Sequence, residues 1–173
     1  MVRYRVCETN HNSAKAIQRT RIIRAYSNKV AMSYPVNSNS ASINFPRERA
    51  LILVVERNPA VQRLERFLLE QAGYSVEFAS DGVSALARAQ ELCPKIIVTE
   101  ILVPRLDGLS LCRALKSDPR TSSIVVLVFS HLHAEDRALE AGADAFIVKP
   151  IEEEHLIETV SKLLEIQREA AGG

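Results

Sequence analysis

The stretch Ile96-Ile97-Val98-Thr99-Glu100-Ile101-Leu102-Val103-Pro104-Arg105-Leu106-Asp107-Gly108 contains an apolar strand that ends at one acid and continues into a turn. A short run that is apolar throughout is typical of a strand covered by helices on both faces, as in a parallel sheet. In open parallel sheets, ligands and chemistry collect beyond the carboxyl ends of the strands. An ionisable residue at that place is therefore a candidate site residue, and Glu100 is such a residue.

Strand and helix patterns alternate five times from residue 50 onward, which predicts a doubly wound parallel α/β sheet. The expected strands are 50–55, 74–79, 95–99, 124–129 and 145–148. The expected helices cover about 58–72, the segment from 81 to 92, the segment after 108, 134–141 and 152–166. Asn58 is an expected helix cap, and Gly73 and Gly142 are expected helix ends.

Two packing expectations follow from these helices. In the helix expected at about 58–72, a set of mainly apolar residues falls on one side and is expected to be the packed face of that helix. This set comprises Val61, Leu64, Phe67, Leu68 and Gln71. Cys93 and Cys112 lie in apolar helical stretches, so we expect buried free thiols. Together with Cys7 they show neither CxxC nor metal-ligand spacing, so no chemistry is assigned to them.

Length and composition fit one compact domain. The chain has 173 residues, of which 47% are hydrophobic and 25% are charged. No apolar run approaches the roughly 20 residues of a membrane helix, and the N-terminus lacks the apolar region of a secretory signal. We therefore expect a soluble protein that is located in the cytoplasm. The domain is expected over 49–167, with 168–173 as a short tail.

Residues 1–48 differ in composition from the rest of the chain. Positions 1–50 hold nine Lys or Arg residues and two acids, whereas 51–173 hold thirteen and nineteen. The run 37–42 is polar and of low complexity, so 33–48 is expected to be a linker and the extension mostly disordered. Four interpretations stay open: a disordered tail, an over-extended start, an arm that binds nucleic acid through phosphates, and an organellar transit peptide.

The motifs beyond residue 50 resemble, in order and spacing, the receiver domain of two-component response regulators. They are Ile52-Leu53-Val54-Val55 before an acid, Gly73-Tyr74, Asp81-Gly82, Pro104 with Asp107-Gly108, Asp118-Pro119, Ser130, Glu140-Ala141-Gly142-Ala143-Asp144 and Lys149-Pro150. The resemblance covers about residues 50–167. It implies a flavodoxin-like (βα)5 fold with strand order 2-1-3-4-5.

The resemblance also implies a site at the strand ends. The family uses two acids that hold Mg²⁺, an Asp that accepts the phosphoryl group, a Ser or Thr, and a Lys. The corresponding residues here are Glu56, Arg57, Glu100, Ser130 and Lys149. Phe146 matches an aromatic switch position, although core packing explains it equally well. Leu102 completes the degenerate Mg²⁺ site together with Glu56 and Glu100.

Two of these positions have changed chemically. Arg57 offers only donors and a positive charge where Mg²⁺ requires an oxygen ligand, so we expect metal binding to be weak or absent. Glu100 is longer than the usual Asp by about one C–C bond, roughly 1.5 Å. Its carboxylate either holds Ser130 and Lys149 in an active-like arrangement or pairs with Arg57. The imidazole of His131, directly after Ser130, could narrow the pocket around the acceptor. The alternative is that His131 and His133 both face solvent from a loop.

The sequence therefore predicts a stand-alone receiver of degenerate type, which is not an enzyme and acts through protein–protein contacts. The expected partner is a histidine kinase, a phosphotransfer protein or an effector. The expected contact face consists of the fourth helix, fifth strand and fifth helix, at 134–141, 145–148 and 152–166. Two alternatives stay open: a phosphorylatable receiver that uses Glu100 or another acceptor, and a nucleic-acid-binding regulator that uses the basic arm.

Overall fold

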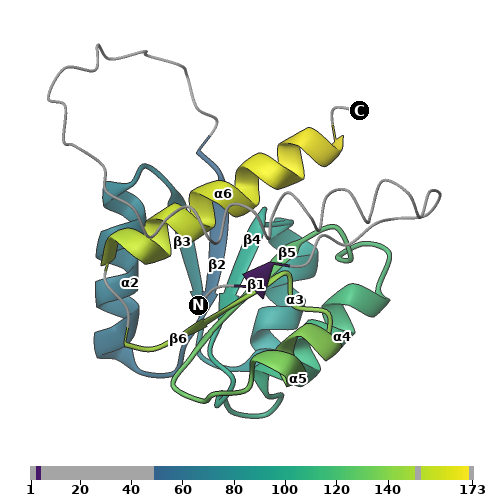
Figure 1. The fold of residues 1–173 in the computed structure, drawn as a ribbon. Coiled ribbons are helices and arrows are strands. Elements are labelled where there is room, and N and C mark those ends of the chain that lie inside the picture. Colours follow the sequence, from purple (N-terminus) through teal and green to yellow (C-terminus); the bar gives the residue numbers. More distant parts are fainter. Residues whose placement is uncertain (1–2, 5–48, 151–152, 172–173) are drawn as a thin grey trace, which may run out of the picture. The chain divides into compact units, whose positions relative to one another are not determined.

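The computed structural model describes residues 3–4, 49–150 and 153–171. Within these residues the chain forms one sheet and five helices (Figure 1). The strands are β1 (Arg3–Tyr4), β2 (Leu51–Val55), β3 (Ser75–Ala79), β4 (Ile96–Thr99), β5 (Val125–Ser130) and β6 (Ala145–Val148). The helices are α2 (Pro59–Gln71), α3 (Gly82–Leu92), α4 (Gly108–Ser117), α5 (Glu135–Glu140) and α6 (Glu153–Ala171).

The predicted fold is confirmed. Strands β2 to β6 pair in parallel in the order β3-β2-β4-β5-β6, which is the order 2-1-3-4-5 of the (βα)5 unit. Most element ends lie within one or two residues of the predicted ends. Ser130 is the last residue of β5 instead of following it, and α6 continues to Ala171, beyond the predicted end at Ile166.

The sequence did not predict strand β1. It pairs antiparallel with β6, where Arg3 lies opposite Phe146 and Tyr4 lies opposite Ala145. The rest of the extension, including the linker at 33–48 and most of the basic arm, lies outside the described residues. Its disorder and its possible functions therefore stay predictions.

The sheet separates two hydrophobic layers, because side chains along each strand alternate between its faces. One layer joins Leu53, Ile97 and Val126 to α3, α4 and α5. The other joins Ile52, Val98 and Leu127 to α2 and α6. Figure 1 shows these two groups of helices on either side of the strands. None of the helices in the described part of the chain is long and apolar enough to cross a membrane.

The predicted packed face of α2 was wrong. Leu64 and Phe67 are 51% and 60% exposed, whereas Glu65 and Leu69 are buried. Leu69 belongs to the layer shared with α6, so the helix packs through the side that carries residues 65 and 69, one turn apart. The apolar residues of α2 are spread around the helix, so their pattern fits more than one packed side. Pattern alone would also not place an acid such as Glu65 on the buried side.

The two cysteines differ. Cys112 is buried, as predicted, but Cys93 is exposed. Cys93 is the C-cap of α3 and adopts a left-handed conformation with φ 47°, so it leaves the helix instead of continuing its packed face. This position explains why the apolar pattern of the helix did not apply to it.

The Asp107-Gly108 pair fixes the start of α4 against the end of β4. The Asp107 carboxylate accepts hydrogen bonds from the backbone N–H groups of Leu109 and Ser110, which caps the helix. A side chain at Gly108 would overlap the carbonyl oxygen of Glu100. Glycine is therefore required for the close approach that places α4 beside Glu100.

Candidate functional site

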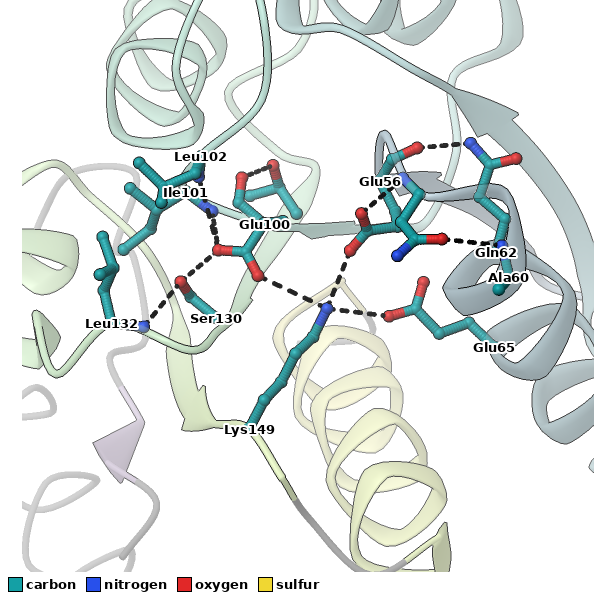
Figure 2. Close-up of polar contacts among 12 residues, drawn as sticks. Glu56, Ala60, Gln62, Glu65, Glu100, Ile101, Leu102, Ser130, Leu132 and Lys149 are labelled. Atoms are coloured by element: carbon teal, nitrogen blue, oxygen red, sulfur yellow. Dashed lines mark hydrogen bonds and ion pairs between the residues drawn. The ribbon is translucent and has the colours of Figure 1, made fainter.

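Four of the predicted site residues meet at the carboxyl ends of neighbouring strands (Figure 2). Glu56 follows β2, Glu100 follows β4, Ser130 ends β5 and Lys149 follows β6. All four side chains belong to buried residues, with at most 8% of each residue exposed. The strand order alone brings them together, because β2, β4, β5 and β6 are consecutive in the sheet.

Lys149 is the centre of the site. Its Nζ lies 3.0 Å from Oε2 of Glu56, 3.4 Å from Oε1 of Glu65 and 3.5 Å from Oε2 of Glu100. It also lies 4.6 Å from the centre of the Phe129 ring. Burial lowers the pKa of this ammonium group, but the three carboxylates outweigh burial and leave the pKa above its usual range. Lys149 is therefore a permanent positive charge in the site.

Both oxygens of Glu100 have partners. Oε1 accepts hydrogen bonds from the Ser130 hydroxyl and from the backbone N–H of Ile101 at 2.7 Å, with Leu102 N at 3.4 Å. Oε2 faces Lys149. The Ser130 hydroxyl in turn accepts a hydrogen bond from the N–H of Leu132 at 3.2 Å. Of the two arrangements that the sequence left open, the structure contains the one in which Glu100 contacts Ser130 and Lys149.

Glu56 and Glu100 contact the Lys149 ammonium group from different sides (Figure 2). Its Oε1 accepts a hydrogen bond from the N–H of Asn58 at 2.8 Å, and its backbone carbonyl accepts one from the Gln62 amide. The loop that leads into α2 therefore fixes the orientation of the Glu56 carboxylate. Its other oxygen is left to bind Lys149.

Arg57 does not enter the cluster. The residue is exposed, and it forms no ion pair with any residue that the structure describes. The positive charge that faces Glu56 and Glu100 comes from Lys149 alone within the same described residues. The alternative in which Glu100 pairs with Arg57 is therefore not the one present, and the exposed Arg57 keeps its charge in solvent, where a charge costs less than in the buried site.

Glu65 is the site residue that the sequence did not reveal. It lies on α2, is 3% exposed, and reaches Lys149 with Oε1. Its Oε2 is buried and has no hydrogen-bond partner in the described part of the chain. Burial raises the pKa of Glu65 to about 7, although the charge of Lys149 lowers it. The only signal in the sequence was its spacing of four from Leu69, which would have identified the buried side of the helix.

The remaining predicted residues lie around this cluster. Phe146 is buried in the layer that contains α3, α4 and α5. The side chain of Leu102 is exposed, and so are His131 and His133, which lie on the loop after β5. The imidazole of His131 therefore faces solvent, which was one of the two arrangements expected for it.

The donor set does not suit Mg²⁺. This ion requires near-octahedral oxygen ligands at about 2.0–2.1 Å, whereas Arg57, which offers only donors and a positive charge, stands where a second acidic ligand would be needed. Among the described residues, no group of three or more His, Cys, Asp or Glu side chains is placed to hold a metal ion. The positive charge inside the cluster is the ammonium group of Lys149.

The chain matches the response regulator receiver domain family over residues 52–161. The DNA-binding dual master transcriptional regulator RpaA of Synechocystis is 35% identical over 116 residues, which are 65% of this chain and 48% of that protein. Response regulator MprA of Mycobacterium leprae is 40% identical over 114 residues, which are 65% of this chain and 50% of that protein. The matched region thus spans about half the length of these relatives.

Solved structures show the same fold. The receiver domain of a signal transduction histidine kinase from Syntrophus aciditrophicus is 34% identical, with a TM-score of 0.64 over 67% of this chain and 90% of that one. The chemotaxis response regulator CheY4 of Vibrio cholerae is 25% identical, with a TM-score of 0.63 over 66% of this chain and 98% of that one. These similarities extend over the described domain.

Proposed function

This chain belongs to the response regulator receiver family, and we propose that its receiver domain signals through protein–protein contacts without being phosphorylated. Receiver domains are signalling modules of two-component systems. The proposal therefore concerns how this domain reaches a signalling state. It describes a binding module and not an enzyme.

The contact between Glu100 and Ser130 carries the proposal. In the resemblance described above, the Ser and Lys positions bind a phosphoryl group that is attached to an Asp. Here a carboxylate that extends one methylene further already contacts Ser130 and Lys149. Since its negative charge occupies the contacts that a phosphoryl group would make, Glu100 acts as a built-in substitute for the phosphorylated residue.

The lack of fit for Mg²⁺ supports the same proposal. Phosphoryl transfer needs a metal ion to neutralise charge on the transferred group and strict alignment of the acceptor. Here Arg57 replaces an acidic ligand for that ion, and the carboxylate of Glu100 extends further than that of the usual Asp. We therefore propose that Mg²⁺ binds weakly or not at all, and that Glu100 does not accept a phosphoryl group.

The proposed partner is a histidine kinase, a phosphotransfer protein or an effector. We assign its contact face to α5, β6 and α6, because Phe146 and Lys149 link this part of the domain to the site. Phe146 lies within β6, three residues before Lys149, so a change at Lys149 is transmitted directly along one strand. The exposed free thiol of Cys93 fits a reducing compartment, and the proposal therefore includes action in the cytoplasm.

Labelling by a small phosphodonor tests the proposal. The full chain is incubated with Mg²⁺ and acetyl phosphate, and intact mass shows whether a phosphoryl group is added. We expect no addition to the natural chain or to either single variant, Glu100→Asp or Arg57→Asp. The double variant, which regains both the acceptor and the metal ligand, is expected to be labelled. Labelling of the natural chain at Glu100 would refute the proposal.

A further inference from the structure

Glu65 has a role in the cluster that the proposed function does not use. It approaches Lys149 from α2, whereas the other two acids approach from the ends of β2 and β4 (Figure 2). Its Oε1 lies 3.4 Å from Nζ, and its Oε2 is buried without a hydrogen-bond partner among the described residues. A buried carboxylate oxygen of this kind is costly when charged, and a proton bound to it removes that cost.

The count of charges shows why this proton matters for the rest of the site. Glu56 and Glu100 together exceed the single charge of Lys149 by one, and an ionised Glu65 raises the excess to two. All three carboxylates then compete for one ammonium group in a buried site. Lys149 lies 3.4 Å from Glu65 and 3.5 Å from Glu100, so a change in charge on Glu65 acts directly on the contact with Glu100.

We propose that Glu65 is a proton-binding site through which pH sets how firmly Lys149 is held against Glu100. This inference rests on the proposed function, in which that contact is part of the signalling state. When Glu65 is protonated, Lys149 is shared between Glu56 and Glu100. When Glu65 loses its proton to solvent, its new charge draws Lys149 away from Glu100.

The midpoint of this change falls in the physiological range, because burial raises the pKa of Glu65 to about 7. The charged groups that face Glu65 are Lys149 from β6, Glu56 from β2 and Glu100 from β4. Lys149 stays protonated throughout this range, since its pKa lies above its usual value. Glu65 thus changes charge near neutral pH while Lys149 stays positively charged.

Nuclear magnetic resonance on the full chain tests the inference without requiring a partner. The side-chain carboxyl carbon of Glu65 reports its own titration, and the Lys149 ammonium nitrogen and the Leu132 amide report the site. Histidines titrate near pH 6.5. The measurement is therefore made in a His131→Asn, His133→Asn background, because both side chains lie on the loop beside Leu132.

We expect all three signals to follow one protonation with a midpoint of about pH 7. In Glu65→Gln, which keeps the shape but cannot ionise, the Lys149 and Leu132 signals should stay constant across that range. Glu91→Gln, which changes an exposed acid on α3, should titrate as the parent does.

Three results would overturn the inference. The first is a Glu65 carboxyl carbon that titrates near its usual value of 4.5. The second is titration of Glu65 that leaves Lys149 and Leu132 unmoved. The third is the same Lys149 and Leu132 titration in Glu65→Gln. Each of these leaves the phosphodonor experiment unaffected, so failure of the proton site is distinguishable from failure of the proposed function.

Discussion

The Ser130 hydroxyl donates a hydrogen bond to Oε1 of Glu100, which joins the end of β5 to the end of β4 inside a buried site. The same hydroxyl accepts the N–H of Leu132, so the loop after β5 is tied to the carboxylate through Ser130. In this chain the acidic residue, the hydroxyl and the loop are connected without any added group. The predictions below follow from that connection and from the shared ammonium group of Lys149.

Ser130→Ala should destabilise the domain by about 2 kcal/mol, because the buried Glu100 carboxylate loses a donor and the Leu132 N–H loses its acceptor. Urea unfolding of the full chain measures the change. Ser123→Ala is the matched control and should change stability by less than about 0.5 kcal/mol, since Ser123 is exposed and, among the described residues, only its backbone carbonyl forms a hydrogen bond. Equal effects of the two variants would contradict the described contact.

Lys149→Met should cost about 3–5 kcal/mol at neutral pH, because it leaves buried carboxylates without their counter-charge. The control is Lys95→Met, which removes the same charge from an exposed side chain. Chemical denaturation should show little change for this control. A loss below about 1 kcal/mol in Lys149→Met would mean that the ammonium group is not the centre of the cluster.

The stability of the domain should depend on the charge of Glu65 between about pH 4.5 and 7. Its pKa is higher in the folded chain than in the unfolded chain, so the folded state binds the proton more tightly. The contribution of protonated Glu65 to the free energy of unfolding is complete below about pH 4.5. It is lost as pH rises through about 7, and the total loss is about 3 kcal/mol.

Unfolding free energies of Glu65→Gln and the natural chain, measured at several pH values, check this sign. The variant should gain on the natural chain as pH rises, because it cannot acquire the buried charge. Glu91→Gln serves as the exposed control and should keep a constant difference from the natural chain. A natural chain that gains stability relative to Glu65→Gln as pH rises would show that the ionised form is the favoured one.

Most of the fold could be predicted from the sequence, because apolar runs such as Ile96–Thr99 distinguish buried parallel strands, and caps such as Asp107 mark where helices begin. The resemblance to the receiver family implied that Glu56, Glu100 and Lys149 meet at the strand ends. Strand order is a property of the whole sheet, and it brings to one edge residues that are far apart in the chain.

The parts that could not be predicted depend on side-chain direction and on long-range pairing. Pattern alone assigned Leu64 and Phe67 to the packed side of α2. The partner that makes a buried Glu65 tolerable is Lys149, which follows β6 and is far from α2 in the sequence. The same limit applies to Arg57, whose side chain could have turned inward or outward. The pairing of β1 with β6 joins residues that are far apart in sequence, and two residues carry no strand pattern of their own.

A phosphoryl mimic distinguishes a site that Glu100 already fills from one that is open to a phosphoryl group. Amide spectra of the full chain are recorded while Mg²⁺ and beryllofluoride, a mimic of the phosphoryl group, are added. We predict that the amides of Ile101, Leu102 and Leu132 stay unchanged, because Glu100 already occupies the contacts of Ser130 and Lys149. The double variant Arg57→Asp, Glu100→Asp should show saturable shifts at the same amides. Saturable shifts in the natural chain would contradict the account, since they would show that the site still accepts the metal ion and the group that Glu100 is proposed to replace.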